Sequence, residues 1–216
     1  MKSITKFNLL LSMIMIICLA TGCAFGGFDA SGYVKACLDS NVHGEFEEYA
    51  KITNSSVEDV EKLYNDFLDN DLAFLDAYNG DDATKAKFRE LFINLYKNLK
   101  YEVGTATKDG ENYTVPVTVH KLMVFRDVSA NMESDMEEYV NTAINSGKTP
   151  STDEIYKYVL DYMYDGISNE LNELEYADPE TINVTVKKDP SLNAYKIDET
   201  ELQNLILEMV DMENAN

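Results

Sequence analysis

The chain has 216 residues, with 18 basic and 39 acidic side chains and a net charge of −21. So acidic a chain offers no basic patch to neutralise phosphates, which argues against nucleic-acid binding. Hydrophobic residues make up 45% of the sequence and include fourteen Tyr and nine Phe, so the chain can bury a core and is not disordered.

Residues 1–22 are predicted to be a signal peptide. Lys2 and Lys6 give it a positive start, and a mostly apolar run over residues 7–20 follows. A helix needs about 20 apolar residues to cross a bilayer, so this run is too short for a stable membrane span. The pattern therefore indicates export followed by removal of the segment.

Small residues precede Cys23 directly after the apolar run. This arrangement resembles the lipobox of bacterial lipoproteins, although Ala20 stands where leucine is usual. The resemblance implies cleavage after Gly22 and a diacylglyceryl group on the Cys23 thiol, which would anchor the protein at the outer face of the cell membrane. The alternative is an ordinary secretory signal that leaves Cys23 unmodified.

Removal of the signal peptide leaves residues 23–216, a length that suits a single domain. Residues 23–30 contain two glycines and are expected to form a flexible tether, followed by one domain over residues 31–212. Cys37 then has no partner for an intrachain disulfide, and its apolar neighbours predict a buried, unreactive thiol. We expect an anionic membrane surface to repel the acidic domain.

Helical periodicity covers most of residues 31–99. The spacing predicts helices over residues 31–38, 46–52, 57–78 and 82–99. Ser55 with Glu58 is expected to cap the third helix, and Asp82 the fourth. In the third helix Asp71 is the only polar residue of the apolar stripe, an unusual place for a carboxylate.

At Lys100 the pattern changes to the alternation of a strand. Residues 101–107 and 112–125 form a predicted hairpin around Asp109 and Gly110, a typical two-residue turn. Pro116 cannot donate a ladder hydrogen bond, so its nitrogen should face an edge or a bulge.

Residues 126–175 are predicted to be a helical hairpin inserted between two strand pairs. Ser151 and Glu154 form a capping box for its second helix. Two short strands over residues 182–186 and 194–197 and a last helix capped by Asp198 complete the chain. The fold class is therefore α+β: N-terminal helices, a four-stranded antiparallel sheet made of two β-hairpins separated by the helical hairpin, and a C-terminal helix.

The sequence predicts no catalytic, cofactor-binding or metal-binding residues. It lacks a nucleophile elbow, a phosphate loop and Cys/His metal spacing. His43 and His120 are isolated and are interpreted as surface or internally bonded residues. The turn over residues 79–82 could hold a cation weakly, but a helix stop and a cap explain it better. The tyrosines of residues 156–176 and the scattered methionines are interpreted as packing residues.

Three features together resemble uncharacterised lipoproteins of Gram-positive bacteria that are grouped as domains of unknown function. They are the lipobox at Cys23, the stretch GYVKACLD over residues 32–39 and the stretch KDGENYTV over residues 108–115. The resemblance implies a lipid-anchored, extracytoplasmic protein of α+β fold and brings no established activity with it.

Three hypotheses for function follow. The first is a non-enzymatic binding or interaction module at the cell envelope, with an envelope protein or a wall polymer as partner. The second is a wall-polymer hydrolase, which needs two carboxylates in one concave site, one of them buried with a raised pKa. The third is a pocket for a small apolar ligand between the helices and the sheet. The sequence leaves the oligomeric state open.

Overall fold

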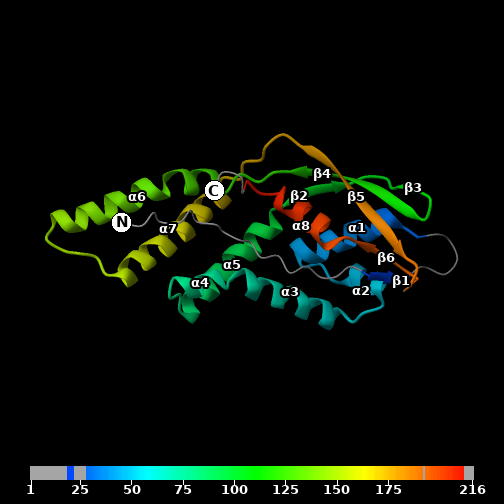
Figure 1. The fold of residues 1–216 in the computed structure, drawn as a ribbon, viewed down its shortest axis with the longest axis horizontal. Helices are drawn as coiled ribbons and strands as arrows, with labels where there is room; N and C mark the ends of the chain where they lie inside the picture. The colour runs from blue at the N-terminus through cyan, green and yellow to red at the C-terminus, as the bar shows by residue number, and fades with distance from the viewer. Residues whose placement is uncertain (1–18, 22–27, 192, 212–216) are drawn as a thin grey trace.

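The computed structural model describes residues 19–21, 28–191 and 193–211 and confirms the predicted α+β fold (Figure 1). Its helices are α1 (Ala30–Leu38), the π-helix η1 (Asp39–His43), α2 (Glu47–Thr53), α3 (Val57–Asp71), α4 (Phe74–Ala77), α5 (Asp82–Lys97), α6 (Arg126–Asn145), α7 (Thr152–Asn172) and α8 (Glu199–Leu207). Its strands are β1 (Leu19–Thr21), β2 (Lys100–Val103), β3 (Thr107–Asp109), β4 (Asn112–His120), β5 (Glu180–Asp189) and β6 (Ala194–Ile197).

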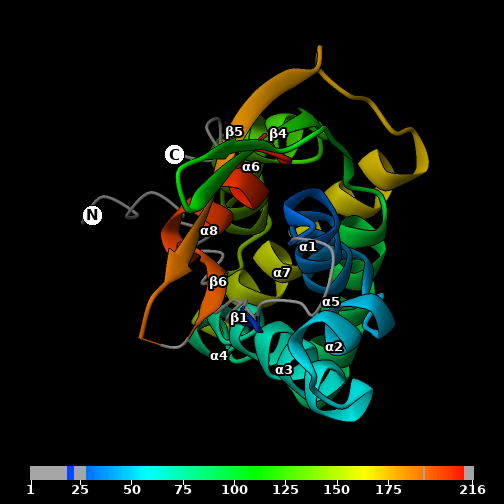
Figure 2. The same ribbon diagram turned by 90° about the vertical axis from the view of Figure 1, so that its right-hand side faces the viewer.

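The strands form one antiparallel sheet in the order β1-β6-β5-β4-β2, and β3 also pairs with β4. Alternate valines of β4 and β5 are buried, as the period of two predicts. The sheet curls, with α1 lying in its concave side (Figure 2). The buried valines join the apolar faces of the helices in one continuous core.

The predicted first strand is divided into β2 and β3 by a bulge opposite Pro116. Val103 pairs with Val117 and Thr107 pairs with Thr114, so three residues of one strand face two of the other. The amide of Gly104 donates to the Pro116 carbonyl at 2.8 Å. The Pro116 nitrogen, which cannot donate a hydrogen bond, therefore faces the bulge between β2 and β3. This is the position expected for a proline in an inner strand.

The strand β1 was not predicted, because it lies within the proposed signal peptide. Its residues pair antiparallel with β6, with Ala20 opposite Tyr195. The proposed cleavage site at Gly22 and Cys23 lies outside the described residues. Processing at that site would remove β1 and leave β6 as the edge of the sheet.

Two helix predictions are wrong in detail. The helix expected over residues 57–78 ends at Asp71, and α4 follows after a short bend. This bend allows both Leu72 and Leu75 to be buried. The N-cap of α3 is Ser56, one residue after the expected Ser55, and the N-cap of α5 is Asp81, one residue before the expected Asp82.

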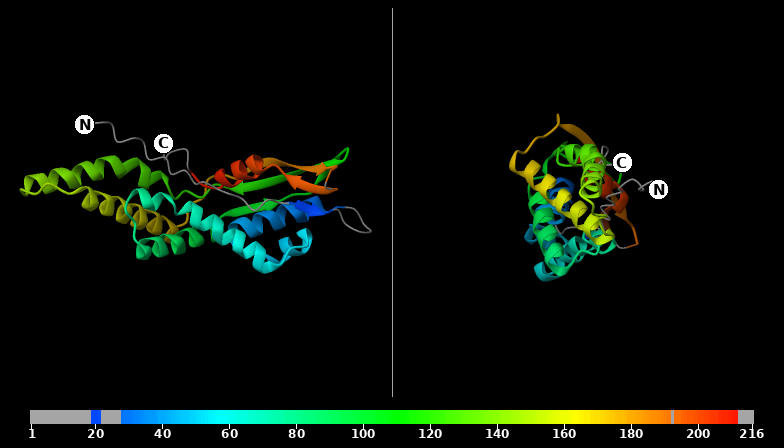
Figure 3. Two further views of the ribbon diagram at one scale, coloured as in Figure 1. Left: turned by 60° about the horizontal axis from the view of Figure 1, so that its bottom comes forward. Right: turned by 90° about the vertical axis from the view of Figure 1, so that its left-hand side faces the viewer.

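The helical insertion forms an arm of two antiparallel helices, α6 and α7, that projects from the sheet (Figure 3). The predicted capping box of Ser151 and Glu154 begins α7. Gly166 allows the helices to approach closely, since a Cβ atom there would lie 2.6 Å from Val128 Cγ2. Farther out, the rings of Tyr139 and Tyr158 stack with their centroids 4.2 Å apart. This contact confirms the interpretation of Tyr158 as a packing residue.

The C-terminal segment fixes the start of this arm. The Asp211 side chain is buried, and its Oδ1 accepts the backbone N–H groups of Val124 and Phe125 at 2.9 Å each. Its Oδ2 accepts the N–H of Arg126 at 2.7 Å. The residue at the N-cap of α6, Phe125, makes no side-chain cap of its own. A carboxylate 85 residues away in the sequence therefore caps the helix.

Candidate functional site

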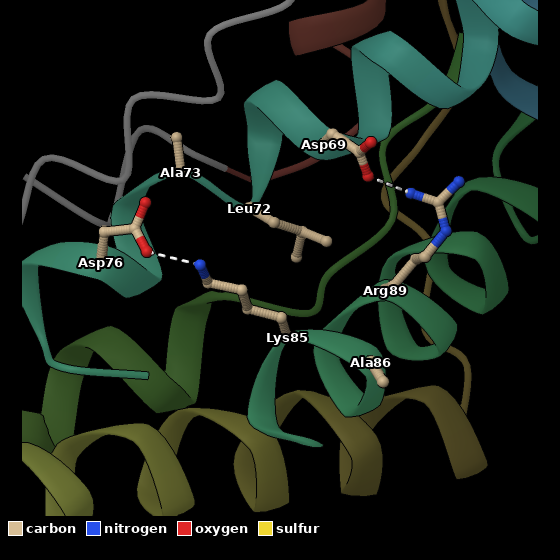
Figure 4. Close-up of a pocket in the computed structure, with 7 residues that line it drawn as sticks. All are labelled: Asp69, Leu72, Ala73, Asp76, Lys85, Ala86 and Arg89. Carbon is tan, nitrogen blue, oxygen red and sulfur yellow. Dashed lines mark hydrogen bonds and ion pairs between the residues drawn. The ribbon is translucent and has the colours of Figure 1, made fainter. Parts of the chain in front are cut away.

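A pocket of about 310 Å³ lies between α3, α4 and the first turns of α5 (Figure 4). It forms because the chain bends after α3, which sets the last residues of α3 and all of α4 opposite α5. The residues that line it are Asp69, Leu72, Ala73, Asp76, Lys85, Ala86 and Arg89. This volume is at the lower end of the range for small-molecule sites.

Two ion pairs bridge the pocket. Lys85 Nζ lies 2.6 Å from Asp76 Oδ1, and Arg89 Nη1 lies 2.6 Å from Asp69 Oδ1. Arg89 also donates through Nη2 to the side-chain oxygen of Asn65 at 2.5 Å, which orients its guanidinium group. The hydrogen bond to Asp76 raises the pKa of Lys85. Lys85 and Arg89 are four residues apart and so lie on one face of α5.

The charged lining of the pocket is balanced, with two acids and two bases around apolar side chains such as Leu72. Asp69 and Asp76 are exposed and each pairs with a cation. An acid–base pair for hydrolysis needs two carboxylates in environments that separate their pKa values. This arrangement instead suits the binding of a small polar molecule that competes for the paired charges.

Asp71 on α3 is a buried carboxylate with a raised pKa. It is 3% exposed, and burial raises its pKa to about 6, although a hydrogen bond from Tyr96 to its Oδ2 at 2.5 Å opposes the rise. Its Oδ1 has no hydrogen-bond partner within the described chain. The group that faces Asp71 is thus a tyrosine and not a second carboxylate, so the pair expected for a hydrolase is not formed here.

The π-helix η1 contributes a second polar cluster, which the sequence did not predict. The Tyr101 hydroxyl donates to Asp39 Oδ1 at 2.5 Å, and Lys35 Nζ donates to Asp39 Oδ2 at 2.5 Å. The His43 ring stacks on Tyr101, and its Nε2 lies 3.0 Å from the Leu99 carbonyl. The interpretation of His43 as an internally bonded residue is therefore confirmed, and the cluster ties η1 to β2.

The other residues considered from the sequence lie apart from the pocket. His120 ends β4 opposite Lys100. The side chain of Asn79 donates to Asp153 Oδ1 at 3.0 Å, and Asp81 caps α5, so this turn is a helix stop and a cap. Cys37 is buried, as predicted. Among the residues that the structure describes, no cluster of three or more His, Cys, Asp or Glu side chains could hold a metal ion.

Sequence reasoning missed the pocket because the two halves of each ion pair lie on different helices. Asp69 and Asp76 belong to separate acidic stretches of the sequence, and neither stretch indicates a binding site by itself. The available indication was the pair Lys85 and Arg89, two bases on one face of a helix in a very acidic chain. The bend between α3 and α4 brings their acidic partners, Asp69 and Asp76, opposite them.

Within the described part of the chain, none of the helices combines the length and the apolar character that crossing a bilayer requires.

The fold has a counterpart among solved structures. The Bacillus subtilis protein ycdA, described as a candidate lipoprotein, matches with a TM-score of 0.56 at 18% sequence identity. The match covers 85% of this chain and 56% of ycdA, so this chain spans about half the length of that protein. At this identity the likeness shows the fold alone. The sequence matches no protein-family model and has no significant match among curated proteins.

Proposed function

We propose that this chain is a lipid-anchored extracytoplasmic protein, held at the outer face of the cell membrane through Cys23, that acts as a binding module. The observation that carries the proposal is the lipobox pattern ending at Cys23. The proposal is supported by ycdA, a protein of similar fold that is described as a candidate lipoprotein. Two acyl chains on Cys23 would give stable attachment, whereas one chain is only marginally sufficient.

The pocket supports a binding role over a hydrolytic one. Its carboxylates, Asp69 and Asp76, are each neutralised by a base, and the buried Asp71 faces a tyrosine. The pocket between α3, α4 and α5 has two acids and two bases in its lining, which does not favour an apolar ligand there. The ligand or partner proposed is a polar component of the envelope, such as a wall polymer or an envelope protein.

The anchor is tested by replacing Cys23 with serine in the full chain and expressing it in a Gram-positive host. We expect the unchanged protein to begin at Cys23, to carry diacylglyceryl mass and to sediment with membranes. The Cys23→Ser variant should lack the added mass and leave the membrane fraction. Cys18→Ala, a change within the predicted signal peptide, is the matched control and should behave like the unchanged protein. An N-terminus elsewhere, or an unmodified Cys23, would refute the anchor.

Binding at the pocket is tested with the double variant Lys85→Ala/Arg89→Ala against a panel of wall fragments and purified envelope proteins. The unchanged protein should bind at least one of them saturably, and the variant should bind it about tenfold or more weakly, since two charge-assisted contacts are lost. Lys62→Ala removes an exposed ion pair with Asp66 on α3 and serves as control. Release of soluble fragments from wall polymer, abolished by Asp69→Asn or Asp76→Asn, would show a hydrolase instead.

A further inference from the structure

The two ends of the long axis of the molecule differ in structure. The β3–β4 and β5–β6 turns lie at one end, together with the start of α1, and the arm formed by α6 and α7 lies at the other (Figures 1 and 3). Both turns therefore lie near Phe28, where the described chain resumes after the segment that contains Cys23.

Phe28 is fixed to the sheet. Its ring stacks on the ring of Tyr195 with the centroids 3.9 Å apart. The centroid of the Tyr113 ring lies 5.7 Å from that of Phe28. The next residue, Asp29, caps α1 by accepting the N–H of Gly32. Phe28 and Asp29 thus pack against or cap elements of the fold, although the tether is predicted over residues 23–30.

The connection from the proposed lipid to the sheet is consequently short. Five residue steps separate Cys23 from Phe28. An extended chain advances at most about 3.6 Å per residue, so the connection spans at most about 18 Å. A lipid on Cys23 would hold this end of the sheet close to the bilayer surface.

The same two ends differ in charge. The two turn regions, residues 105–114 and 186–197, contain four lysines and three acids, whereas the arm, residues 126–175, contains three bases and twelve acids. Lys188 pairs with Glu111 and Lys196 pairs with Asp189. That leaves two lysines, Lys108 and Lys187, and one acid, Asp109, exposed and without an ion pair within the described residues. The acidic helix α2 is set back from these turns (Figure 1).

We propose that the β3–β4 and β5–β6 turns form the membrane-facing end of the protein, where Lys108 and Lys187 contact anionic lipid headgroups, and that the arm is held farthest from the bilayer. The lysines are attracted by the anionic surface, and the acidic arm is repelled by it. This orientation would present the arm to partners beyond the membrane. The proposal rests on the lipid anchor at Cys23.

The test measures energy transfer from a fluorophore on the protein to an acceptor lipid. The lipidated protein is reconstituted into vesicles of phosphatidylcholine with 30% phosphatidylglycerol, or of phosphatidylcholine alone. The label is placed at Thr107→Cys in β3 or at Ser146→Cys at the outer end of α6; both positions are exposed, whereas Cys37 is buried. A helix of the length of α6 extends about 30 Å, so we expect at least about twofold more transfer from position 107 in anionic vesicles.

The charge contribution is tested in the same assay. Lys108→Glu/Lys187→Glu should raise the transfer from position 146 in anionic vesicles and have little effect in neutral ones. Lys148→Glu/Lys157→Glu changes the charge equally but in the arm, and should leave the transfer from position 146 low. High salt should weaken the difference between the two vesicle types.

Three outcomes would contradict the orientation: equal transfer from both positions, greater transfer from position 146, or no response to Lys108→Glu/Lys187→Glu. A protein that carries the lipid but shows one of these results refutes the orientation alone. A protein that lacks acyl mass and does not associate with vesicles refutes the anchor and, with it, this inference.

Discussion

Replacement of Asp211 by alanine is expected to lower the free energy of unfolding by about 3–5 kcal/mol, because two buried backbone N–H groups and one partly buried one lose their acceptor. These are the N–H groups at the start of α6, at residues 124–126, which both oxygens of Asp211 bind. No side chain at the N-cap of α6 can take over this role. Such a loss is a large share of the total stability of a typical domain.

The effect is measured by urea unfolding at pH 7, followed by circular dichroism and tyrosine fluorescence. Asp211→Asn keeps one acceptor oxygen and should lose less than Asp211→Ala. Glu208→Ala, in the same segment as Asp211, removes a partly exposed ion pair with Lys121 and should cost less than about 1 kcal/mol. Amide hydrogen exchange at residues 124–126 should accelerate only in the Asp211 variants.

Urea unfolding of Asp211→Ala would show whether Asp211 stabilises the arm alone or the whole domain. If the arm unfolds alone, the urea transition of Asp211→Ala should split into two steps, because α6 and α7 extend away from the sheet. If Asp211 contributes nothing, the midpoints of Asp211→Ala and Glu208→Ala should coincide. The second result would contradict the assignment of Asp211 as the cap of α6.

Patterns within a few residues predicted much of this fold. The alternation of valines in β4 predicted its buried face, because side chains in a strand point to opposite faces. The capping box of Ser151 and Glu154 lies within one helical turn and was placed correctly. The stripe that contains Asp71 also predicted its burial, since every third or fourth residue of a helix shares one face.

Contacts between distant segments could not be predicted in the same way. The bond from Tyr101 to Asp39 joins residues 62 apart, and the bond from Arg126 to Asp211 joins residues 85 apart. The pocket depends on where the chain bends after α3, and this bend has no glycine or proline to indicate it. Tertiary packing, not local preference, ends α3 at Asp71 and so sets Asp76 opposite Lys85.

Replacement of Asp71 by asparagine is expected to stabilise the protein at pH 7 by about 2–3 kcal/mol. The pKa of Asp71 is raised from 3.8 to about 6 in the folded state, because burial disfavours the charged form. Between these two values the folded state binds more protons than the unfolded state. The free energy of unfolding therefore falls as pH rises through this window, by about 3 kcal/mol for a shift of this size.

Asparagine has nearly the same shape as the protonated carboxyl group and can still accept the hydrogen bond from Tyr96. The variant and the unchanged protein should therefore be nearly equal in stability at pH 4. Their difference should grow through pH 4–6 and become constant above about pH 7. Many other carboxyl groups titrate in this range, so the quantity to measure is the difference between the two urea unfolding energies at each pH.

Asp69→Asn is the matched control, because Asp69 lies two residues away but is exposed and pairs with Arg89. Its unfolding energy should differ from that of the unchanged protein by less than about 1 kcal/mol at each pH. A flat difference for Asp71→Asn, or a variant less stable at pH 7 than at pH 4 relative to the unchanged protein, would contradict the raised pKa. Either result would mean that Asp71 keeps its charge at low cost, through a partner for its Oδ1 atom.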